Sequence, residues 1–186
     1  MSVLSHSSGP RSNGYSESKF TNWTAYDPFF AEAQTALKRF DARIPKEPAF
    51  PHVVSLHPRL SDFIHACSRA EVTARLEKME PASLQGLRVV FLLAGIRKQE
   101  RSWGSRLGCY GIYWRPCVFL CAHPFFLGSF NRDSLREFYL DNVLVHEIAH
   151  HVDRQRMGNK QAKEAFAHAY VQQQSSFPGE KRKWKF

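Results

Sequence analysis

The first half of the chain carries one clear helix pattern and one clear strand pattern. Residues 27–40, DPFFAEAQTALKRF, predict a helix, because Asp suits the N-cap and the following Pro suits the first helical position. Residues 41–57 contain three prolines and predict an extended connector. Residues 61–79 predict one helix or two short ones. The run 87–95, LRVVFLLAG, is almost continuously apolar, so it predicts a central strand buried on both faces.

Two short apolar runs in the middle of the chain predict a β-hairpin. They cover residues 109–114 and 117–122, and they flank an Arg-Pro pair at 115–116 that suits a turn. A polar loop, residues 96–108, separates the hairpin from the central strand. The apolar loop FFLGSFN at 125–131 either shapes a substrate pocket or covers the core.

Two further helices are predicted near the C-terminus. Ser134 and Glu137 resemble a capping box, so a helix is expected over about 133–158. Asn159 is expected to cap a second helix over about 160–174. A chain of 186 residues suits one domain. The order of elements therefore predicts a single α+β domain with a small mixed sheet, a hairpin, and helices before and after it.

Composition adds a strong positive charge to this picture. The apolar fraction of 43% indicates a globular protein, and the net charge is +9. Such a charge favours an anionic partner, which can be a nucleic acid, an acidic protein or a membrane surface, but a basic soluble protein without such a partner fits as well. The basic tail, residues 177–186, is either solvated or contacts a nucleic acid or an acidic partner.

The N-terminus shows no targeting pattern. Residues 1–22 are rich in Ser, Gly and Asn and are predicted to be a disordered leader. No secretory signal is visible, so a cytoplasmic location is expected, although a Ser-rich leader is compatible with export by a non-cleaved signal. No apolar run approaches the roughly 18 residues of a membrane span.

The four cysteines are expected to be reduced thiols. Cys67, Cys109, Cys117 and Cys121 form no C-x-x-C pair, which argues against a separate zinc knuckle. The last three lie in strand-like apolar sequence, where buried free thiols are common. A disulfide within the hairpin would need an oxidising compartment.

The candidate chemistry lies in the stretch VLVHEIAHHVD at 143–153. His146, Glu147 and His150 form the pattern H-E-x-x-H, and on a helix the two His lie one turn apart on the same face. Both can bind one metal ion, while Glu147 can reach a water molecule as a general base. The pattern predicts a Zn²⁺ hydrolase site. Apolar residues at helical spacing support the helix: Val145, Ile148, Ala149 and Val152.

A third protein ligand is expected on the next helix. Glu164 and His168 lie one turn apart on one face, and a helical hairpin turning near 158–159 brings both alongside His150. Spacing alone leaves both as candidates for the third ligand.

The order of strand, loop, hairpin, metal helix and following helix, over residues 87–174, resembles the core of the zincin metallopeptidases. The stretch 164–170, EAFAHAY, resembles the third-ligand helix of the gluzincins, in which a Glu ligand precedes an Ala-rich turn. In size the chain is similar to the minigluzincins. This resemblance implies a zincin-like fold, zinc peptidase activity and Glu164 as the third ligand. An acidic residue often follows four positions later in that group. Here His168 stands there, so it either takes another supporting role or replaces Glu164.

A second resemblance is to the SprT/Spartan group, whose third ligand is a His at short spacing after the motif. It implies His168 as a ligand and a protease that acts on proteins bound to DNA, which suits the net charge of +9. The glycine-bearing loop that precedes the third His in that group is not visible here, so this resemblance ranks second. A non-catalytic zinc protein associated with nucleic acid is the remaining alternative.

Further residues have predicted supporting roles. Asp153, three residues after the second motif His, either hydrogen-bonds a ligand His or is solvated. Tyr170, Tyr113 and Tyr110 are candidate hydrogen-bond donors to the oxyanion of a tetrahedral intermediate. Residues 107–113 are predicted to form the edge strand on which a substrate peptide lies.

These predictions divide the chain into an N-terminal helical segment, residues 23–80, and a metallopeptidase core, residues 81–176. The N-terminal segment either packs on the core or acts as a prosegment that covers the site. As a prosegment it would offer the metal an inhibitory ligand from among Cys67, His52, His57 and His65.

Overall fold

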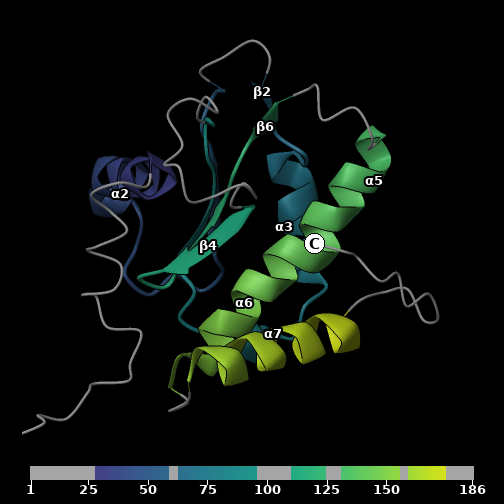
Figure 1. Ribbon diagram of the computed structural model, residues 1–186. Helices are drawn as coiled ribbons and strands as arrows, with labels where there is room; N and C mark the ends of the chain where they lie inside the picture. The colour runs from purple at the N-terminus through teal and green to yellow at the C-terminus, as the bar shows by residue number, and fades with distance from the viewer. Residues whose placement is uncertain (1–27, 59–62, 96–109, 125–130, 156–158, 175–186) are drawn as a thin grey trace, which may run out of the picture.

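The computed structural model describes residues 28–58, 63–95, 110–124, 131–155 and 159–174 (Figure 1). The predicted Ser-rich leader, the polar loop 96–108 and the basic tail lie outside the described residues, as does nearly all of the apolar loop 125–131.

A four-stranded mixed sheet forms the centre of the domain, in the order β1-β3-β5-β4. The strands are β1 (His52–Ser55), β3 (Val89–Leu92), β4 (Gly111–Trp114) and β5 (Cys117–Leu120). β1, β3 and β5 run parallel to one another, and β4 pairs antiparallel with β5. The sheet confirms the α+β prediction, the hairpin and the central strand, because every residue of β3 is buried.

Strand β1 lies inside the segment predicted to be an extended connector, so residues 52–55 are extended as predicted but form a strand of the sheet, which was not predicted. The prolines of the segment all precede the strand, so none removes a hydrogen bond from the ladder. The partner of the strand is β3, more than thirty residues later. A four-residue strand stabilised by such a distant partner leaves little local signal. A short 3₁₀ turn, η1 (Asp41–Arg43), follows the confirmed first helix, α2 (Pro28–Phe40).

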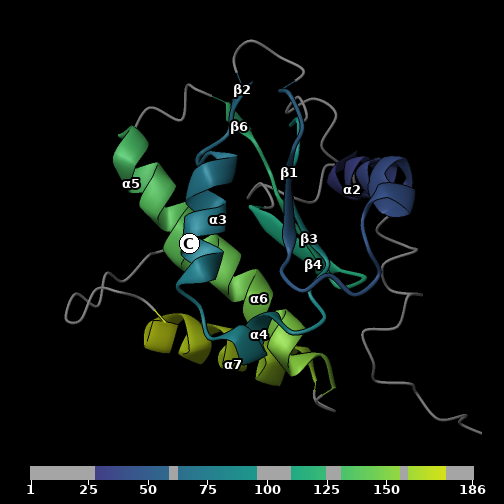
Figure 2. The same cartoon turned by 180° about the vertical axis from the view of Figure 1, so that it is seen from behind.

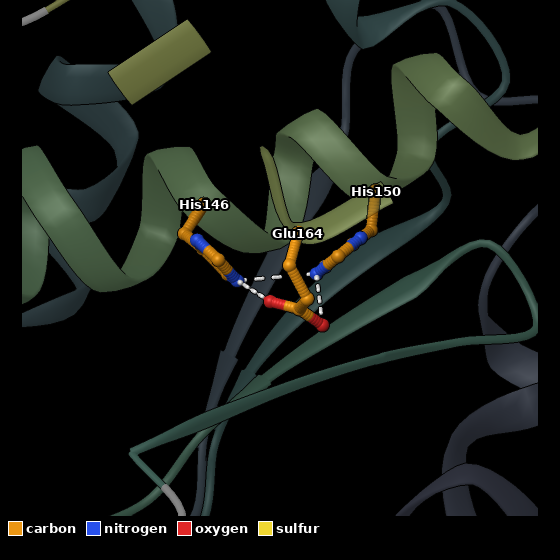
Figure 3. A group of neighbouring side chains, drawn as sticks. All are labelled: His146, His150 and Glu164. Carbon is orange, nitrogen blue, oxygen red and sulfur yellow. Dashed lines mark hydrogen bonds and ion pairs between the residues drawn. The ribbon is translucent and has the colours of Figure 1, made fainter. Parts of the chain in front are cut away.

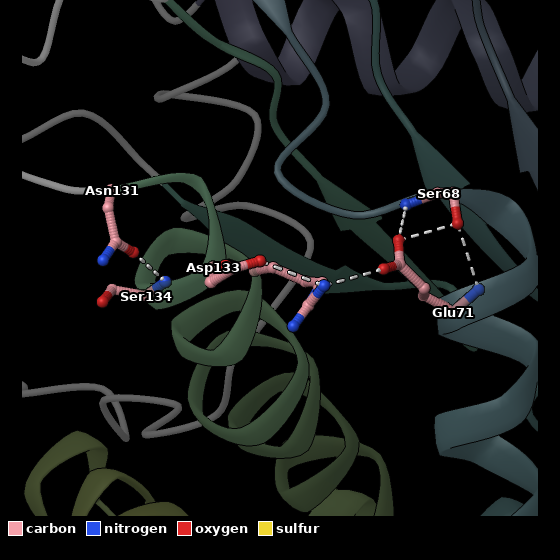
Figure 4. Close-up of polar contacts among 6 residues, drawn as sticks. Ser68, Glu71, Asn131, Asp133 and Ser134 are labelled. Atoms are coloured by element: carbon pink, nitrogen blue, oxygen red, sulfur yellow. Dashed lines mark hydrogen bonds and ion pairs between the residues drawn. The ribbon is translucent and has the colours of Figure 1, made fainter.

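The predicted helix over 61–79 is correct only in its second half. Strand β2 (Phe63–Ile64) pairs with β6 (His123–Pro124), and helix α3 covers Arg69–Glu77. Ser68 starts the helix, because its hydroxyl accepts a hydrogen bond from the Glu71 N–H and its own N–H donates to the Glu71 carboxylate at 2.7 Å (Figure 4). A short helix, α4 (Pro81–Leu84), was not predicted.

The metal motif lies in a long continuous helical stretch that contains α-, π- and 3₁₀-helical parts. It consists of α5 (Arg132–Glu137), the π-helical turn η3 (Phe138–Val143), α6 (Leu144–Val152) and the 3₁₀ turn η4 (Asp153–Gln155). The capping-box prediction is wrong. Asn131 is the cap, because its side-chain oxygen accepts a hydrogen bond from the Ser134 N–H at 2.7 Å (Figure 4).

The last helix confirms its predicted bounds. Helix α7 covers Lys160–Gln174, and the Asn159 side chain accepts a hydrogen bond from the Ala162 N–H at 2.8 Å. The helix packs directly against α6 (Figure 1). Glu164, in the first half of α7, therefore reaches His146 and His150 of the metal motif.

Helices cover both faces of the sheet (Figures 1 and 2). Alternate residues of each strand point to opposite faces, so Val90 and Leu92 face α3, α4 and α6, while Val89 and Phe91 face α2. Cys67, Cys117 and Cys121 are buried free thiols in the described chain, as predicted, whereas Cys109 lies outside it. No helix among the described residues is long and apolar enough to cross a membrane.

The N-terminal segment is part of the same packed domain. Besides strand β1, it contributes Arg75 of α3, whose guanidinium lies 2.8 Å from the Asp141 carboxylate on η3 and 2.9 Å from the Gln174 carbonyl at the end of α7. Arg75 thus ties three helical segments together. This contact is what we expect of a structural segment; the prosegment role stays an untested prediction.

Candidate metal centre

Helix α6 presents the motif residues toward one side because its opposite side is apolar. Leu144, Val145, Ile148 and Ala149 are fully buried in the core beneath the sheet. Val152, which was predicted to extend this stripe, is 38% exposed, because the α-helix ends there and a 3₁₀ turn follows.

Three side chains from two helices meet at one point. His146 and His150 project from α6, and Glu164 projects from α7 toward both of them (Figure 3). The two His Nε2 atoms are 3.1 Å apart. The Glu164 carboxylate oxygens lie 3.3 Å from His146 Nε2 and 3.8 Å from His150 Nε2.

These separations fit a tetrahedral metal ion. Two ligand atoms that each lie about 2.0–2.2 Å from zinc at a tetrahedral angle are roughly 3.3–3.6 Å apart. One donor atom from each side chain lies within 4.8 Å of the other two, so His146, His150 and Glu164 could hold one metal ion.

The side-chain packing separates the two candidates for the third ligand. Glu164 directs its carboxylate at both motif His. His168, one turn later on α7, is exposed, and its ring centroid lies 5.3 Å from that of His146 in an edge-to-face arrangement. The structure thus places Glu164 in the cluster and His168 beside it. The contact of the His168 ring with His146 is compatible with the supporting role that was the alternative prediction for His168.

The protonation states also suit metal binding. Burial, together with the neighbouring His150, lowers the pKa of His146 to about 4, and burial lowers the pKa of His150 as well. Both imidazoles are therefore neutral near pH 7, which is the form that coordinates a metal.

Glu147 occupies a different environment from Glu164. It is only 9% exposed, and burial together with the charge of Glu164 raises the pKa of its carboxyl group to about 8. A hydrogen bond from the backbone N–H of Tyr113 on β4 opposes this rise. The carboxyl group can therefore gain or lose a proton near neutral pH.

Strand β4 approaches Glu147 closely because residue 111 is a glycine. A β-carbon on Gly111 would lie 2.9 Å from Glu147 Cγ and 2.8 Å from Val143 Cγ1, closer than real contacts allow. We did not identify Gly111 from the sequence. A glycine inside a predicted strand can mark such a close approach, and that was the available signal.

The outward edge of β4 faces the motif helix. The N–H of Cys121 donates to the carbonyl of Tyr110 at 3.0 Å, so these two residues form a hydrogen-bonded pair of the hairpin. Because such pairs alternate in an antiparallel ladder, Gly111 and Tyr113 direct their backbone groups away from β5. They point toward the open side of the sheet, where Glu147 lies.

Only some of the residues predicted to support the metal site interact with the cluster. Asp153 is buried, and its charge acts to raise the pKa of His150, in keeping with a role beside that ligand. The Tyr170 hydroxyl donates to Ser83 Oγ at 2.6 Å, and Tyr110 packs against Phe138. A hydroxyl has one hydrogen to donate, so Tyr170 has no donor left for an oxyanion in this conformation.

Tyr113 and His151 form a contact that the sequence analysis missed. The Tyr113 hydroxyl lies 3.1 Å from His151 Nδ1. His151 is fully buried, and burial lowers its pKa to about 4. The sequence offered only the second His of an H-H pair as a signal, and nothing in the motif showed that it faces β4.

No protein-family model, curated protein or solved structure matches this chain in comparisons of sequence and of fold.

Proposed function

We propose that this protein is a zinc-dependent metallopeptidase. The observation that carries the proposal is a three-residue metal cluster with a buried carboxyl group, Glu147, next to the first His in sequence and within electrostatic range of Glu164. Two His, one carboxylate and an adjacent glutamate base are the donor set of zinc hydrolases. Only three protein ligands gather among the described residues, which leaves a coordination position for water or substrate.

His146, His150 and Glu164 would hold the zinc ion. When bound, zinc acts as a Lewis acid that makes water more acidic and polarises a carbonyl group. The neutral state of both imidazoles and the negative charge of Glu164 give the site a net charge of −1, which favours a divalent cation.

Glu147 would move the proton. Its carboxylate accepts a proton from the attacking water and delivers it to the nitrogen of the leaving amine. A carboxyl group whose pKa lies near the working pH can both accept and release a proton. Burial of Glu147 raises its pKa to about 8, so both proton transfers are accessible near neutral pH.

The edge of β4 would hold an extended substrate. Peptides often bind by adding a strand to the edge of a sheet, with main-chain hydrogen bonds that tolerate many sequences. β4 is the outer strand of the described sheet, and it lies beside the motif helix. Because the Tyr113 N–H is bonded to Glu147, a peptide on this edge would pair with backbone groups of β4 other than that N–H. A peptide or protein segment in extended form is therefore the proposed substrate class.

A SprT-like protease acting on nucleic-acid-bound proteins is the second candidate function. The observations that favour it are the His168 ring beside His146 and the net charge of +9. The carboxylate of Glu164 within 4 Å of both motif His favours the gluzincin-like site instead. A closed four-ligand site using both residues would favour a structural zinc in a non-catalytic protein.

Zinc content of purified full-length variants tests the metal site. We expect one zinc per chain in the wild type and in Glu147→Gln, and loss of zinc in Glu164→Ala. Glu137→Ala on α5, an exposed glutamate, is the matched control and should keep its zinc. Loss in His168→Ala with retention in Glu164→Ala would support the SprT-like alternative, and a wild type that takes up no zinc would refute both.

Hydrolysis of a mixed peptide library, followed by mass spectrometry, tests the activity. Glu147→Gln should lower the rate by about 10²–10⁴-fold while zinc content stays stoichiometric. A zinc-loaded wild type that cleaves no peptide or unfolded protein, or a Glu147→Gln variant as active as the wild type, would contradict the proposed mechanism.

A further inference from the structure

Tyr113 contacts the motif helix through both its backbone and its side chain. Its N–H donates a hydrogen bond to the Glu147 carboxylate, and its hydroxyl lies 3.1 Å from His151 Nδ1. Glu147 and His151 are four residues apart on α6, so they lie one turn apart on the same face of the helix. Tyr113 of β4 therefore contacts two successive turns of α6.

Both ring nitrogens of His151 have polar neighbours. Nε2 lies 3.0 Å from the carbonyl oxygen of Gln85, which can only accept a hydrogen bond, and 2.8 Å from Arg154 Nη1, which can only donate one. These two neighbours favour opposite tautomers of the imidazole. A hydroxyl can donate to Nδ1 or accept from it, so the Tyr113–His151 hydrogen bond forms in either tautomer.

We propose that Tyr113 and His151 are positioning residues that hold strand β4 on Glu147. The hydroxyl contact fixes the strand against the helix, and the backbone N–H then stays on the carboxylate of the base. The role in catalysis rests on the proposed peptidase function, whereas the physical contact does not.

Two further features make this contact sensitive to small shifts. Residues 111 and 113 direct their backbone groups away from β5, so no strand in the described sheet holds this edge of β4 in place. A β-carbon at residue 111 would overlap Glu147 and Val143, so little space remains for β4 to move toward the helix. Movement away from the helix is opposed by the Tyr113 hydroxyl. Displacements of about 1 Å at a reacting group can lower rates about 10²-fold.

Hydrogen exchange of the residue 113 amide tests the proposal directly. The variant is Tyr113→Phe, which removes the hydroxyl and keeps the ring and the amide. In the zinc-free full-length protein, measured by NMR, we expect exchange at residue 113 to become about tenfold faster, the effect of losing one hydrogen bond. Tyr139→Phe is the matched control, because its buried hydroxyl also donates one hydrogen bond, to the Cys121 carbonyl at 2.8 Å.

A double-variant comparison separates positioning from general destabilisation. His151→Phe keeps a ring of similar size and removes both nitrogens. It should accelerate the residue 113 amide as Tyr113→Phe does, and adding Tyr113→Phe to it should give no further increase. Unchanged exchange in Tyr113→Phe, or equal acceleration in Tyr139→Phe, would overturn the proposal.

Kinetics then test the catalytic meaning of the contact. If the protein cleaves peptides, Tyr113→Phe should lower kcat with little change in KM and with full zinc content, while Tyr139→Phe should keep kcat. A kcat unchanged in Tyr113→Phe would overturn the positioning role. Peptidase activity absent from every variant, with the exchange response present, would refute the proposed function and leave the Tyr113–His151 contact established.

Discussion

Replacing Gly111 by alanine should damage the site more than the fold. The added β-carbon would lie 2.8 Å from Val143 Cγ1, 2.9 Å from Glu147 Cγ and 3.1 Å from Glu147 Oε1. Two of these atoms belong to the proposed base, and the third belongs to a packed core residue. Either β4 moves outward or the Glu147 side chain changes its rotamer, and both changes separate the carboxylate from the Tyr113 N–H.

The magnitude follows from the size of the overlap. Forcing one extra carbon into a packed site costs about 1–3 kcal/mol. In a domain of this size each kcal/mol lowers Tm by about 2–4 °C, so Tm should fall by roughly 2–12 °C. The loss of kcat should exceed what that decrease in stability explains, because the folded fraction at 25 °C remains high. Zinc content should be unchanged, because the three atoms nearest to the added β-carbon belong to Val143 and Glu147 and not to the cluster of His146, His150 and Glu164.

Gly95→Ala provides a control of similar cost at a different place. Gly95 has φ of +89°, so alanine there is strained by about 1–2 kcal/mol, and the N–H of the preceding Ala94 donates to Glu32 on α2 rather than to a residue of the motif helix. We expect a comparable fall in Tm with normal kcat. The reasoning is refuted if Gly111→Ala has the Tm and kcat of the wild type, or if both variants lose activity in proportion to Tm.

Three other changes test the packing around the site. Arg75→Met should lower the free energy of unfolding in urea by about 3 kcal/mol, because it leaves the largely buried Asp141 carboxylate unpaired. Arg136→Met, at a partly exposed arginine, should lower it by less than about 1 kcal/mol, and equal losses in the two variants would contradict the structure. Deleting residues 1–80 should abolish cooperative thermal unfolding, since the sheet loses β1; a truncated protein that unfolds cooperatively would favour a removable prosegment instead. In the metal-free protein the Tm advantage of the wild type over His151→Phe should shrink as pH falls from 6.5 toward 4. The pKa of His151 is lowered to about 4 in the folded state, so the unfolded chain binds the proton first as pH falls, and the stability that neutral His151 contributes is lost. A difference in Tm that stays constant with pH would contradict this.

Elements with strong local signals could be predicted from the sequence. Helix α7 has a capping Asn159 before it, and the hairpin has an Arg-Pro turn between two apolar runs. The central strand β3 is apolar throughout because both of its neighbours and both of its faces bury it. In each case the residues that specify the element lie within it or beside it.

Features that depend on distant partners could not be predicted in the same way. Strand β1 is stabilised by its hydrogen bonds to β3, and no residue near β1 in the sequence indicates that pairing. Two polar residues near the start of α5 could each cap the helix, and only the backbone path selects Asn131 over Ser134. The choice between Glu164 and His168 depends on how α7 rotates against α6, which is set by core packing rather than by spacing.

The π-helical turn η3 makes one place in the helix before the motif tolerant of a change in length. The Leu144 N–H donates to the Tyr139 carbonyl five residues earlier, so this turn contains one residue more than an α-helix would need. A deletion of one residue within Phe138–Val143 that restored α-helical bonding would keep the Asn131 cap and the metal motif facing as they do now. In an α-helix each residue advances the side-chain direction by about 100°, so the same deletion in α5 or α6 would rotate the cap and the motif relative to each other by about that angle. In any descendant of this chain that is one residue shorter before His146, the lost residue should therefore come from the π-helical turn.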